Sequence, residues 1–269
     1  MRIYHYTDLN GLKGIIENHS LWATNFFFLN DSEELRHGIR AFRNALEYLS
    51  DDLNEKSINI LKDEIIRFNM HRANHQYNIS FCEEPDLLSQ WRGYGATQGV
   101  CLEFESDELI QSLIYGNAQV LSGPVIYTKP DSTLEAKKEI INFLRDEKLI
   151  KKIEVEPMYE IISAIDIVHK LPPFLKNDRF SEEKEFRIVV QPNQPYEDVK
   201  FRVNAYGVIP YLELNANKNN MWNGRLPLKS IKIGPAKEKA FLWDGIKFLL
   251  QSKGYGNVDF SFTETPFRS

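Results

Sequence analysis

A glutamate-rich segment around residue 185 holds the residue types that acid–base chemistry requires. If residues 184–190 form a strand, the side chains of Glu183, Glu185 and Arg187 share one face, because successive side chains in a strand alternate. Neighbouring carboxylates raise each other's pKa, whereas a nearby guanidinium lowers it. The spacing therefore indicates either an electrostatically coupled row of acids in a site or an exposed strand face whose ion pairs contribute little.

A histidine near the amino terminus is the second candidate. Residues 2–6 alternate polar and apolar side chains and are rich in strand formers, which predicts a short strand that contains His5. Burying an imidazole is costly unless its ring nitrogens are hydrogen-bonded. His5 is therefore either a satisfied core histidine or a ligand-binding residue, and its neighbours Tyr6 and Thr7 add hydroxyl groups to the same segment.

The segment Trp91-Arg92-Gly93-Tyr94-Gly95 combines aromatic rings, a guanidinium and flexible glycines. Arginine binds phosphate oxygens in a bidentate manner, and glycine lets a ligand approach the backbone closely. The same residues also suit packing and hinge formation. Their spacing matches neither a P-loop nor a dinucleotide-binding glycine motif. The spacing therefore does not distinguish phosphate binding from a role in packing or as a hinge.

Metal ligands are sparse in the sequence. His71 and His75 have the i, i+4 spacing of two ligands on a helix, but no third ligand lies nearby in the sequence, and zinc needs three or four. We therefore predict no metal at these histidines. A metal-dependent nuclease is one alternative, and it would require four carboxylates to converge on magnesium: Asp31, Glu33, Glu34 and Glu183.

Hydrophobic periodicity predicts the elements that must position these residues. Thr7 or Asp8 offers an N-cap for a first helix of about three turns. The other expected helical segments are 31–49, 54–72, 85–91, 133–149, 157–170 and 237–250. The expected strands are 2–6, 20–24, 77–82, 100–104, one or two within 120–127, then 184–190, 201–203, 207–214, 230–234 and 258–262.

Helices cluster between groups of strands without strict alternation, which favours an α+β fold with a mixed, mostly antiparallel sheet. We expect one domain over residues 1–269, with helical insertions at about 31–72 and 131–172. The second insertion is either a separate lobe or two ordinary packing helices.

Composition limits the functional class. A hydrophobic content of 42%, a charged content of 26% and a net charge of −5 are ordinary for a globular protein and argue against wholesale coating of nucleic acid. Cys82 and Cys101 lie in apolar segments and are expected to be reduced core residues. No apolar run reaches transmembrane length, so we expect no membrane association and a cytoplasmic location.

Several motifs resemble an uncharacterised bacterial family, a domain of unknown function. They include Tyr4-His5-Tyr6-Thr7, Trp91 to Gly95 and Glu183-x-Glu185-x-Arg187. More distantly, the opening strand and its leucine-rich helix resemble ADP-ribosyltransferase-type domains. That resemblance implies a split sheet and an NAD-consuming transferase or NAD glycohydrolase, of the kind found among toxin-like or phage-defence effectors.

The resemblance also implies roles for individual residues. NAD would be the cofactor, consumed as substrate, and the acceptor would be an unknown protein or nucleic acid. Glu185 would be the catalytic acid, Glu183 would assist the nucleophile, and His5 would hold the ribose. The residues expected to bind NAD are His5, Tyr6, Thr7, Trp91, Arg92, Tyr94 and Arg187. A catalytically inactive module that binds a nucleotide or a partner is the remaining alternative.

Overall fold

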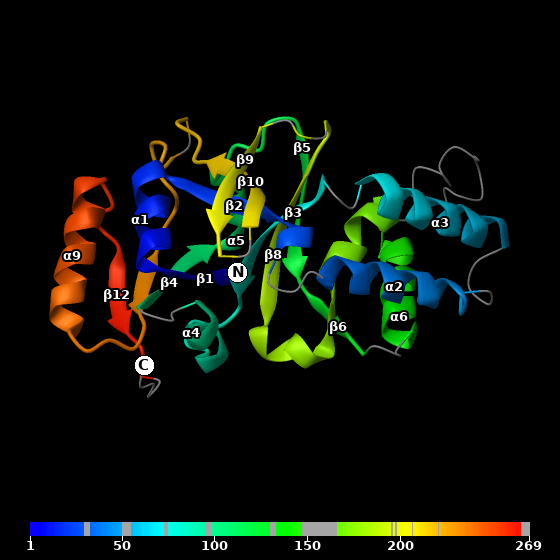
Figure 1. The fold of residues 1–269 in the computed structure, drawn as a ribbon, viewed down its shortest axis with the longest axis horizontal. Helices are drawn as coiled ribbons and strands as arrows, with labels where there is room; N and C mark the ends of the chain where they lie inside the picture. Colours follow the sequence, from blue (N-terminus) through cyan, green and yellow to red (C-terminus); the bar gives the residue numbers. More distant parts are fainter. Residues whose placement is uncertain are drawn as a thin grey trace.

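The computed structural model shows an α+β protein with a long sheet and a group of helices to one side of it (Figure 1). It describes residues 1–29, 33–49, 55–72, 75–94, 98–129, 133–146, 166–194, 196, 198–205, 207–219 and 221–264. The expected fold class is therefore confirmed.

One mixed sheet contains ten of the described strands, in the order β12-β11-β4-β1-β3-β2-β10-β9, with β8 also paired to β3 and β5 to β8. Its strands are β1 (Arg2–Asp8), β2 (Ser20–Asn25), β3 (Tyr77–Cys82), β4 (Gly99–Glu105), β5 (Ala118–Pro124), β8 (Glu185–Pro192), β9 (Val199–Asn204), β10 (Gly207–Asn215), β11 (Ser230–Ile233) and β12 (Asp259–Phe262). Only β11 and β12 pair in parallel in this sheet. A separate pair joins β6 (Ile126–Thr128) to β7 (Leu175–Asn177).

The sheet splits at β3. One edge of this strand pairs with β8 along its whole length. At its other edge, Asn78 pairs with Thr24 of β2, and Cys82 pairs with Tyr4 of β1. The first two strands therefore diverge from each other along β3.

Helix α1 (Leu9–Asn18) connects these two diverging strands. The Asp8 carboxylate accepts a hydrogen bond of 2.7 Å from the Gly11 amide, which satisfies a free donor at the helix start. Leu12, Ile15 and Ile16 face the sheet and are buried. The local sequence thus accounts for the whole strand–helix–strand opening.

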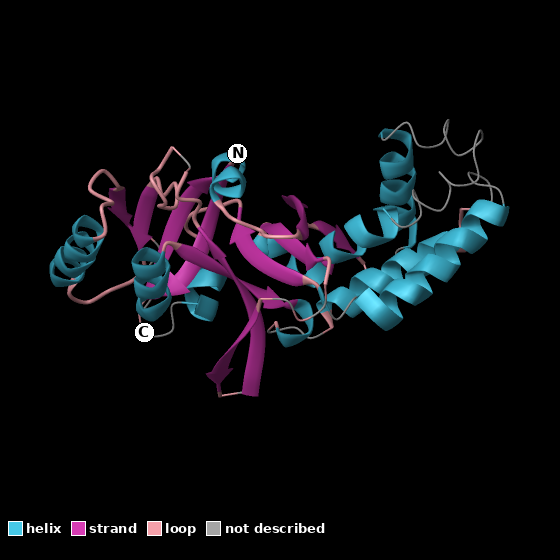
Figure 2. Cartoon of the chain, turned by 90° about the horizontal axis from the view of Figure 1, so that it is seen from above, coloured by secondary structure: helices cyan, strands magenta, loops and turns pink. Residues whose placement is uncertain are grey.

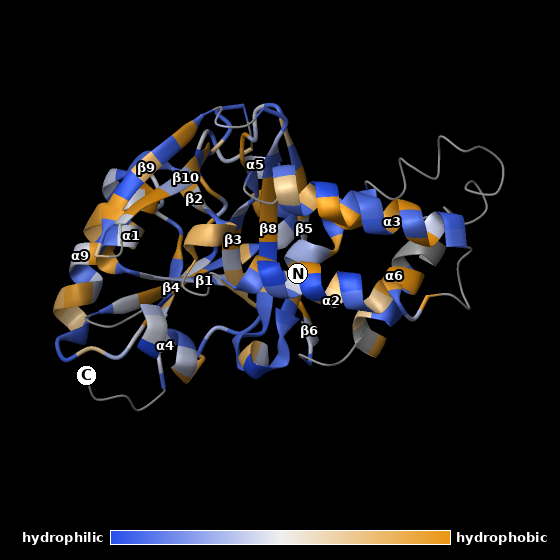
Figure 3. Cartoon of the chain, turned by 45° about the vertical axis from the view of Figure 1, so that its right-hand side comes forward, coloured by the Kyte–Doolittle hydropathy of each residue, from blue (hydrophilic) through white to orange (hydrophobic). Residues whose placement is uncertain are grey.

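Two hydrophobic cores lie on opposite faces of β8. Ile188 and Val190 belong to the main core, whereas Val189, one residue apart, belongs to the second core. The second core is built by α2 (Glu34–Leu46), α3 (Glu55–Arg67) and α6 (Thr133–Asp146), together with residues 166–175. These helices extend sideways from the sheet (Figure 2), and hydrophobic residues recur along them (Figure 3).

Smaller elements complete the described chain. They are the 3-10 helices η1 (Phe26–Phe28), η4 (Pro172–Phe174) and η5 (Asp178–Glu183), the π-helical turn η2 (Phe68–Arg72), and the helices α4 (Leu88–Tyr94), α5 (Ser106–Ser112) and α9 (Lys239–Ser252). Helix α5 was not expected from the sequence. None of the described helices has the length and apolar character needed to cross a membrane.

One expected strand differs in a way that affects the candidate site. The strand expected over residues 184–190 begins at Glu185. Lys184 has a left-handed backbone with φ of 43°, and Glu183 belongs to the preceding 3-10 helix. The expectation that Glu183 and Arg187 share one strand face was therefore wrong, because the chain turns between Glu183 and Glu185.

Candidate functional site

A buried network of charges joins the sheet to the helical group. The Arg187 guanidinium donates through Nε and NH2 to the two Glu185 oxygens, each at 2.8 Å, and NH2 also lies 2.9 Å from Glu34 Oε2. Its NH1 donates to the Pro173 carbonyl. Arg187 is fully buried, so every one of these partners replaces water that it lost on folding.

A second cation completes the network. Lys176 Nζ lies 2.5 Å from Glu34 Oε1, 2.6 Å from Glu183 Oε2 and 2.9 Å from Glu185 Oε2. Three carboxylates therefore share two cations. Four elements supply the five residues: α2, β7, η5 and β8.

The two glutamates near residue 185 have opposite electrostatic environments. Burial would raise the pKa of Glu185, but Arg187 and Lys176 hold it down to about 2. Burial raises the pKa of Glu183 above its ordinary value, and the attraction of Lys176 only partly offsets this effect. Glu185 is thus held as an anion, whereas Glu183 keeps its proton to a higher pH than an ordinary glutamate.

Glu183 is also the acid of the network that reaches solvent. Its side chain is 30% exposed, compared with 4% for Glu185. Tyr94, at the end of α4, is 45% exposed, but its hydroxyl is buried, and this burial together with the charges of Glu183 and Glu185 raises its pKa to about 12. Glu183 is therefore the open side of the buried cluster, and the Tyr94 hydroxyl lies close enough to be affected by its charge.

His5 lies on the opposite face of the sheet. Tyr4 pairs with Cys82 and Cys82 pairs with Glu185, so these three side chains point to one face. His5, next to Tyr4, points to the other face, where its ring lies 5.4 Å from that of Phe81 in the main core. The structure does not bring His5 together with Glu185.

A structural role accounts for His5. Its Nδ1 lies 3.0 Å from the Ser80 carbonyl, which can only accept, so Nδ1 donates. Ser80 belongs to β3 in the region where β1 and β2 diverge, and the imidazole supplies the hydrogen bond that a paired strand would have given. Burial lowers the pKa of His5, which favours the neutral ring. Thr7 follows two residues later on the same face.

The remaining predicted residues separate into buried and exposed ones. The Tyr6 hydroxyl is buried, donates to the Glu84 carbonyl and accepts from the Leu87 amide. The Trp91 ring is 1% exposed, packs edge-on against Tyr6 and donates from Nε1 to Asp86. Neither ring has a free face for a ligand. Arg92 is exposed on α4, and Gly95 lies outside the described residues.

The described residues offer no group of three or more ligands suited to a metal ion. Asp31 lies outside the described part of the chain. Glu33 pairs with Arg36 and Arg40 at the surface, whereas Glu34 pairs with buried cations. These two acids therefore point into different surroundings.

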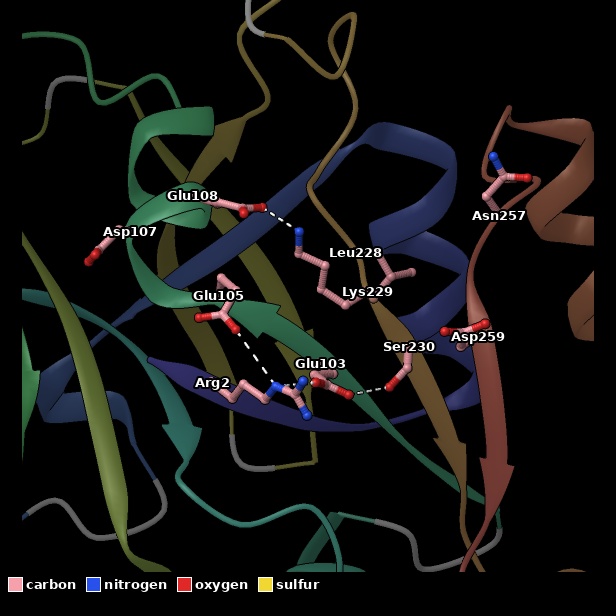
Figure 4. A pocket seen from close by; sticks show the side chains of 10 residues that line it. All are labelled: Arg2, Glu103, Glu105, Asp107, Glu108, Leu228, Lys229, Ser230, Asn257 and Asp259. Carbon is pink, nitrogen blue, oxygen red and sulfur yellow. Dashed lines mark hydrogen bonds and ion pairs between the residues drawn. The ribbon is translucent and has the colours of Figure 1, made fainter.

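A shallow depression of about 780 Å³ lies at a different part of the sheet (Figure 4). Five carboxylates line it, from Glu103, Glu105, Asp107, Glu108 and Asp259. Arg2 and Lys229 lie among them and pair with Glu103 and Glu108. None of the residues predicted from the sequence to form a site lines this depression.

Sequence reasoning missed two members of the buried network. Lys176 had no assigned role, and Glu34 was considered as a helix-capping residue and as a metal ligand, not as a partner of buried cations. A lysine inside the apolar run Pro-Pro-Phe-Leu-Lys was a usable signal, because a buried lysine requires anionic partners. Its partners lie as far away as residue 34, so local spacing could not identify them.

Comparison with known families covers the same region. Residues 90–188 match a family model described as a protein of unknown function, DUF2971. The resemblance to an uncharacterised family is thereby confirmed over these residues. No curated protein and no solved structure matches the chain.

The DUF2971 region contains most of the candidate site. It includes Tyr94, Lys176, Glu183, Glu185 and Arg187. Glu34 and His5 lie outside it. The network around Glu185 thus belongs largely to the matched region, with Glu34 added from helix α2.

Proposed function

We propose that the protein cleaves the bond between nicotinamide and ribose in NAD, with Glu183 as the carboxylate that contacts the substrate. Departure of nicotinamide leaves positive charge on the ribose, as in glycoside hydrolysis. An ionised carboxylate next to that carbon stabilises the charge and can accept a proton from the attacking nucleophile. Water would give NAD hydrolysis, and a protein or nucleic-acid acceptor would give ADP-ribosyl transfer.

The observation that carries this proposal is the contrast between Glu183 and Glu185. Adjacent carboxylates whose environments push their pKa values apart are typical of acid–base sites. Glu185 is buried and bound on both oxygens, so its role would be to hold Lys176 and Arg187 in position. Glu183 is open to solvent and keeps a raised pKa. Tyr94 would supply the aromatic wall for nicotinamide.

This proposal differs from the expectation drawn by resemblance. His5 has no part in it, because its ring lies on the other face of the sheet. Trp91 has no part either, because its ring is buried. The proposed chemistry therefore rests on Glu183, Tyr94 and the cations behind them.

Binding without turnover is the second candidate. Every Glu185 oxygen is bound to a cation, which is what a structural charge network requires. A cleft that binds NAD or ADP-ribose at Tyr94 would need no reactive carboxylate. Measuring affinity and nicotinamide release separately distinguishes these two functions.

The test is incubation of the purified protein with NAD labelled in the adenosine half, with and without cell lysate. We expect free nicotinamide to appear and Glu183→Gln to reduce its release by about a hundredfold, the usual loss for a preorganised electrostatic partner. Glu182→Gln is the matched control, since this neighbour is exposed on the same 3-10 helix. Full activity of Glu183→Gln would contradict the proposal. NAD binding without release of nicotinamide would favour the second candidate.

The pH dependence of nicotinamide release offers an independent test. Glu183 must be ionised to stabilise the ribosyl cation or to accept a proton. Because burial raises its pKa, the rate should rise with pH through a value above the ordinary glutamate range. A rate that instead falls over this interval would contradict the assigned role.

A further inference from the structure

A second polar surface lies on the sheet at strands β2, β9 and β10, apart from the residues used above. The Arg202 guanidinium stands over the Trp22 ring, with 5.6 Å between Cζ and the ring centroid. Its NH2 donates to Thr24 Oγ1 at 3.1 Å. The Tyr211 ring lies 4.4 Å from that of Trp22, at a tilt of 31°. Three adjacent strands therefore place an arginine, an indole and a hydroxyl together.

The arginine has unused binding capacity. No carboxylate forms an ion pair with Arg202 among the residues that the structure describes, and burial lowers its pKa. Its fork of five donors makes one hydrogen bond to a side chain, at Thr24. A partly desolvated guanidinium without an anion carries an uncompensated desolvation cost. A bound anion would offset this cost through charge-assisted hydrogen bonds.

The nearby acid does not fill this role. The Glu213 carboxylate is held by Lys200 and by a 3.0 Å hydrogen bond from Ser20. The pKa of Glu213 is lowered by the bond from Lys200, so it stays ionised and paired. Its charge is largely balanced by Lys200, which leaves Arg202 as the unbalanced charge of the surface.

Two buried amide side chains near Thr24 have atoms without hydrogen-bond partners. Thr24 pairs directly with Asn78 in the sheet, and Asn78 Oδ1 has no hydrogen-bond partner. Both amide atoms of Gln76 are likewise unpaired, and each residue is at most 2% exposed. Buried polar groups are nearly always satisfied in folded proteins. This part of the sheet therefore holds more polar groups than the chain itself pairs.

We propose that Arg202, Thr24 and Trp22 form a binding site for a nucleoside phosphate. Arg202 binds the phosphate in a bidentate manner, and the Thr24 hydroxyl, which accepts from Arg202, donates to a phosphate oxygen. The Trp22 ring, 38% exposed, contacts the base. The site takes a free nucleotide or the phosphate of a single strand, and it requires no bond cleavage.

This site can be tested by calorimetric titration with four ligands: AMP, adenosine, inorganic phosphate and a ten-nucleotide oligodeoxyadenylate. We expect AMP to bind more tightly than adenosine or phosphate alone, with an affinity that falls as salt is raised. Much tighter binding of the oligonucleotide would identify a single strand as the source of the nucleotide, and comparable binding would identify a free nucleotide.

Variants assign the binding to these side chains. Arg202→Gln and Thr24→Val should each weaken AMP binding, the first by about tenfold or more. Arg36→Gln is the matched control, because Arg36 also stands over an aromatic ring, that of Phe27, but is paired with Glu33. Thermal unfolding confirms that each variant is folded. Three results would overturn the proposal. They are the absence of saturable binding of AMP or the oligonucleotide, equal affinities for phosphate and AMP, and an unchanged AMP affinity in Arg202→Gln.

This test is independent of NAD cleavage. Glu183→Gln should leave AMP affinity unchanged, because Glu183 belongs to η5, which packs on β6, β7 and α4, and its carboxylate pairs with Lys176. Failure of nicotinamide release with intact AMP binding contradicts only the proposed cleavage. The reverse result contradicts only the site at Arg202.

Discussion

At the scale of single residues, two glutamates two positions apart have different tasks. Glu185 begins a strand and is enclosed by Arg187 and Lys176, whereas Glu183 ends a 3-10 helix and reaches solvent. The left-handed backbone of Lys184 separates them. Period-two reasoning gave the wrong geometry for this segment, because a single positive φ in a non-glycine residue is not visible in the sequence pattern.

Replacing Glu185 should therefore lower the free energy of unfolding, because its role is to hold buried cations rather than to contact the substrate. Glu185→Gln removes the anion that faces two buried cations, and breaking such a pair typically costs about 3–5 kcal/mol. We expect urea denaturation at neutral pH to show a loss of this size. Glu182→Gln, at an exposed neighbouring position, should change the free energy of unfolding by less than about 0.5 kcal/mol. Equal stability of the two variants would show that the network contributes nothing.

The same residue predicts how stability depends on pH. The pKa of Glu185 is lowered to about 2 in the folded protein, compared with roughly 4.3 for an unperturbed glutamate. Its contribution is complete above the unfolded pKa and is lost as pH falls through the folded one. Wild type should thus lose stability between about pH 4.5 and pH 2. Glu185→Gln should lose less over that interval, as measured by urea midpoints.

At the scale of elements, helix α2 approaches the chain around Pro172 more closely than a side chain would allow. A methyl group on Gly38 would lie 2.0 Å from the Pro172 carbonyl oxygen and 3.3 Å from that of Leu175. Glycine is unfavourable inside a helix by up to about 1 kcal/mol relative to alanine. Its presence here is explained by close packing, which brings Glu34 on the same helix to Arg187 and Lys176.

Gly38→Ala should consequently destabilise the protein despite the better helix propensity. Overpacking against backbone costs about 1–3 kcal/mol, which exceeds the propensity gain. Gly14→Ala in α1 is the control, because nothing lies within 4 Å of its added methyl, and it should stabilise by about 0.5–1 kcal/mol. Thermal unfolding of both variants measures the difference. A stabilised Gly38→Ala would mean that α2 shifts freely.

Local patterns predicted most elements because local interactions determine them. The opening strands and helix, β4, β10 and α9 follow from periodicity and from the Asp8 cap. The buried network could not be predicted, because it joins Glu34, Lys176 and Arg187 across long stretches of chain. The surface at Arg202 was missed for the same reason, since Trp22 and Arg202 meet only through the order of strands in the sheet.

At the scale of the whole molecule, β8 connects two cores. Its alternating side chains enter the sheet core at Ile188 and Val190 and the helical core at Val189, and all three are fully buried. The charge network lies at the beginning of the same strand. This strand and the ion pairs of α2 with it therefore contribute to holding the helical group on the sheet, together with the packing of α2 on β7 and η4.

Two neighbouring substitutions test whether the cores unfold as one unit. Val189→Ala and Val190→Ala remove equal volumes and should each cost about 2 kcal/mol, from roughly 0.8 kcal/mol per buried methylene plus a cavity. If the cores open separately, native-state hydrogen exchange should accelerate in α2 and α3 for Val189→Ala. For Val190→Ala it should accelerate in β3, β5 and the strands beyond. Identical exchange profiles would show that β8 couples both cores into a single cooperative unit, and a ligand bound near Glu183 would then stabilise both cores together.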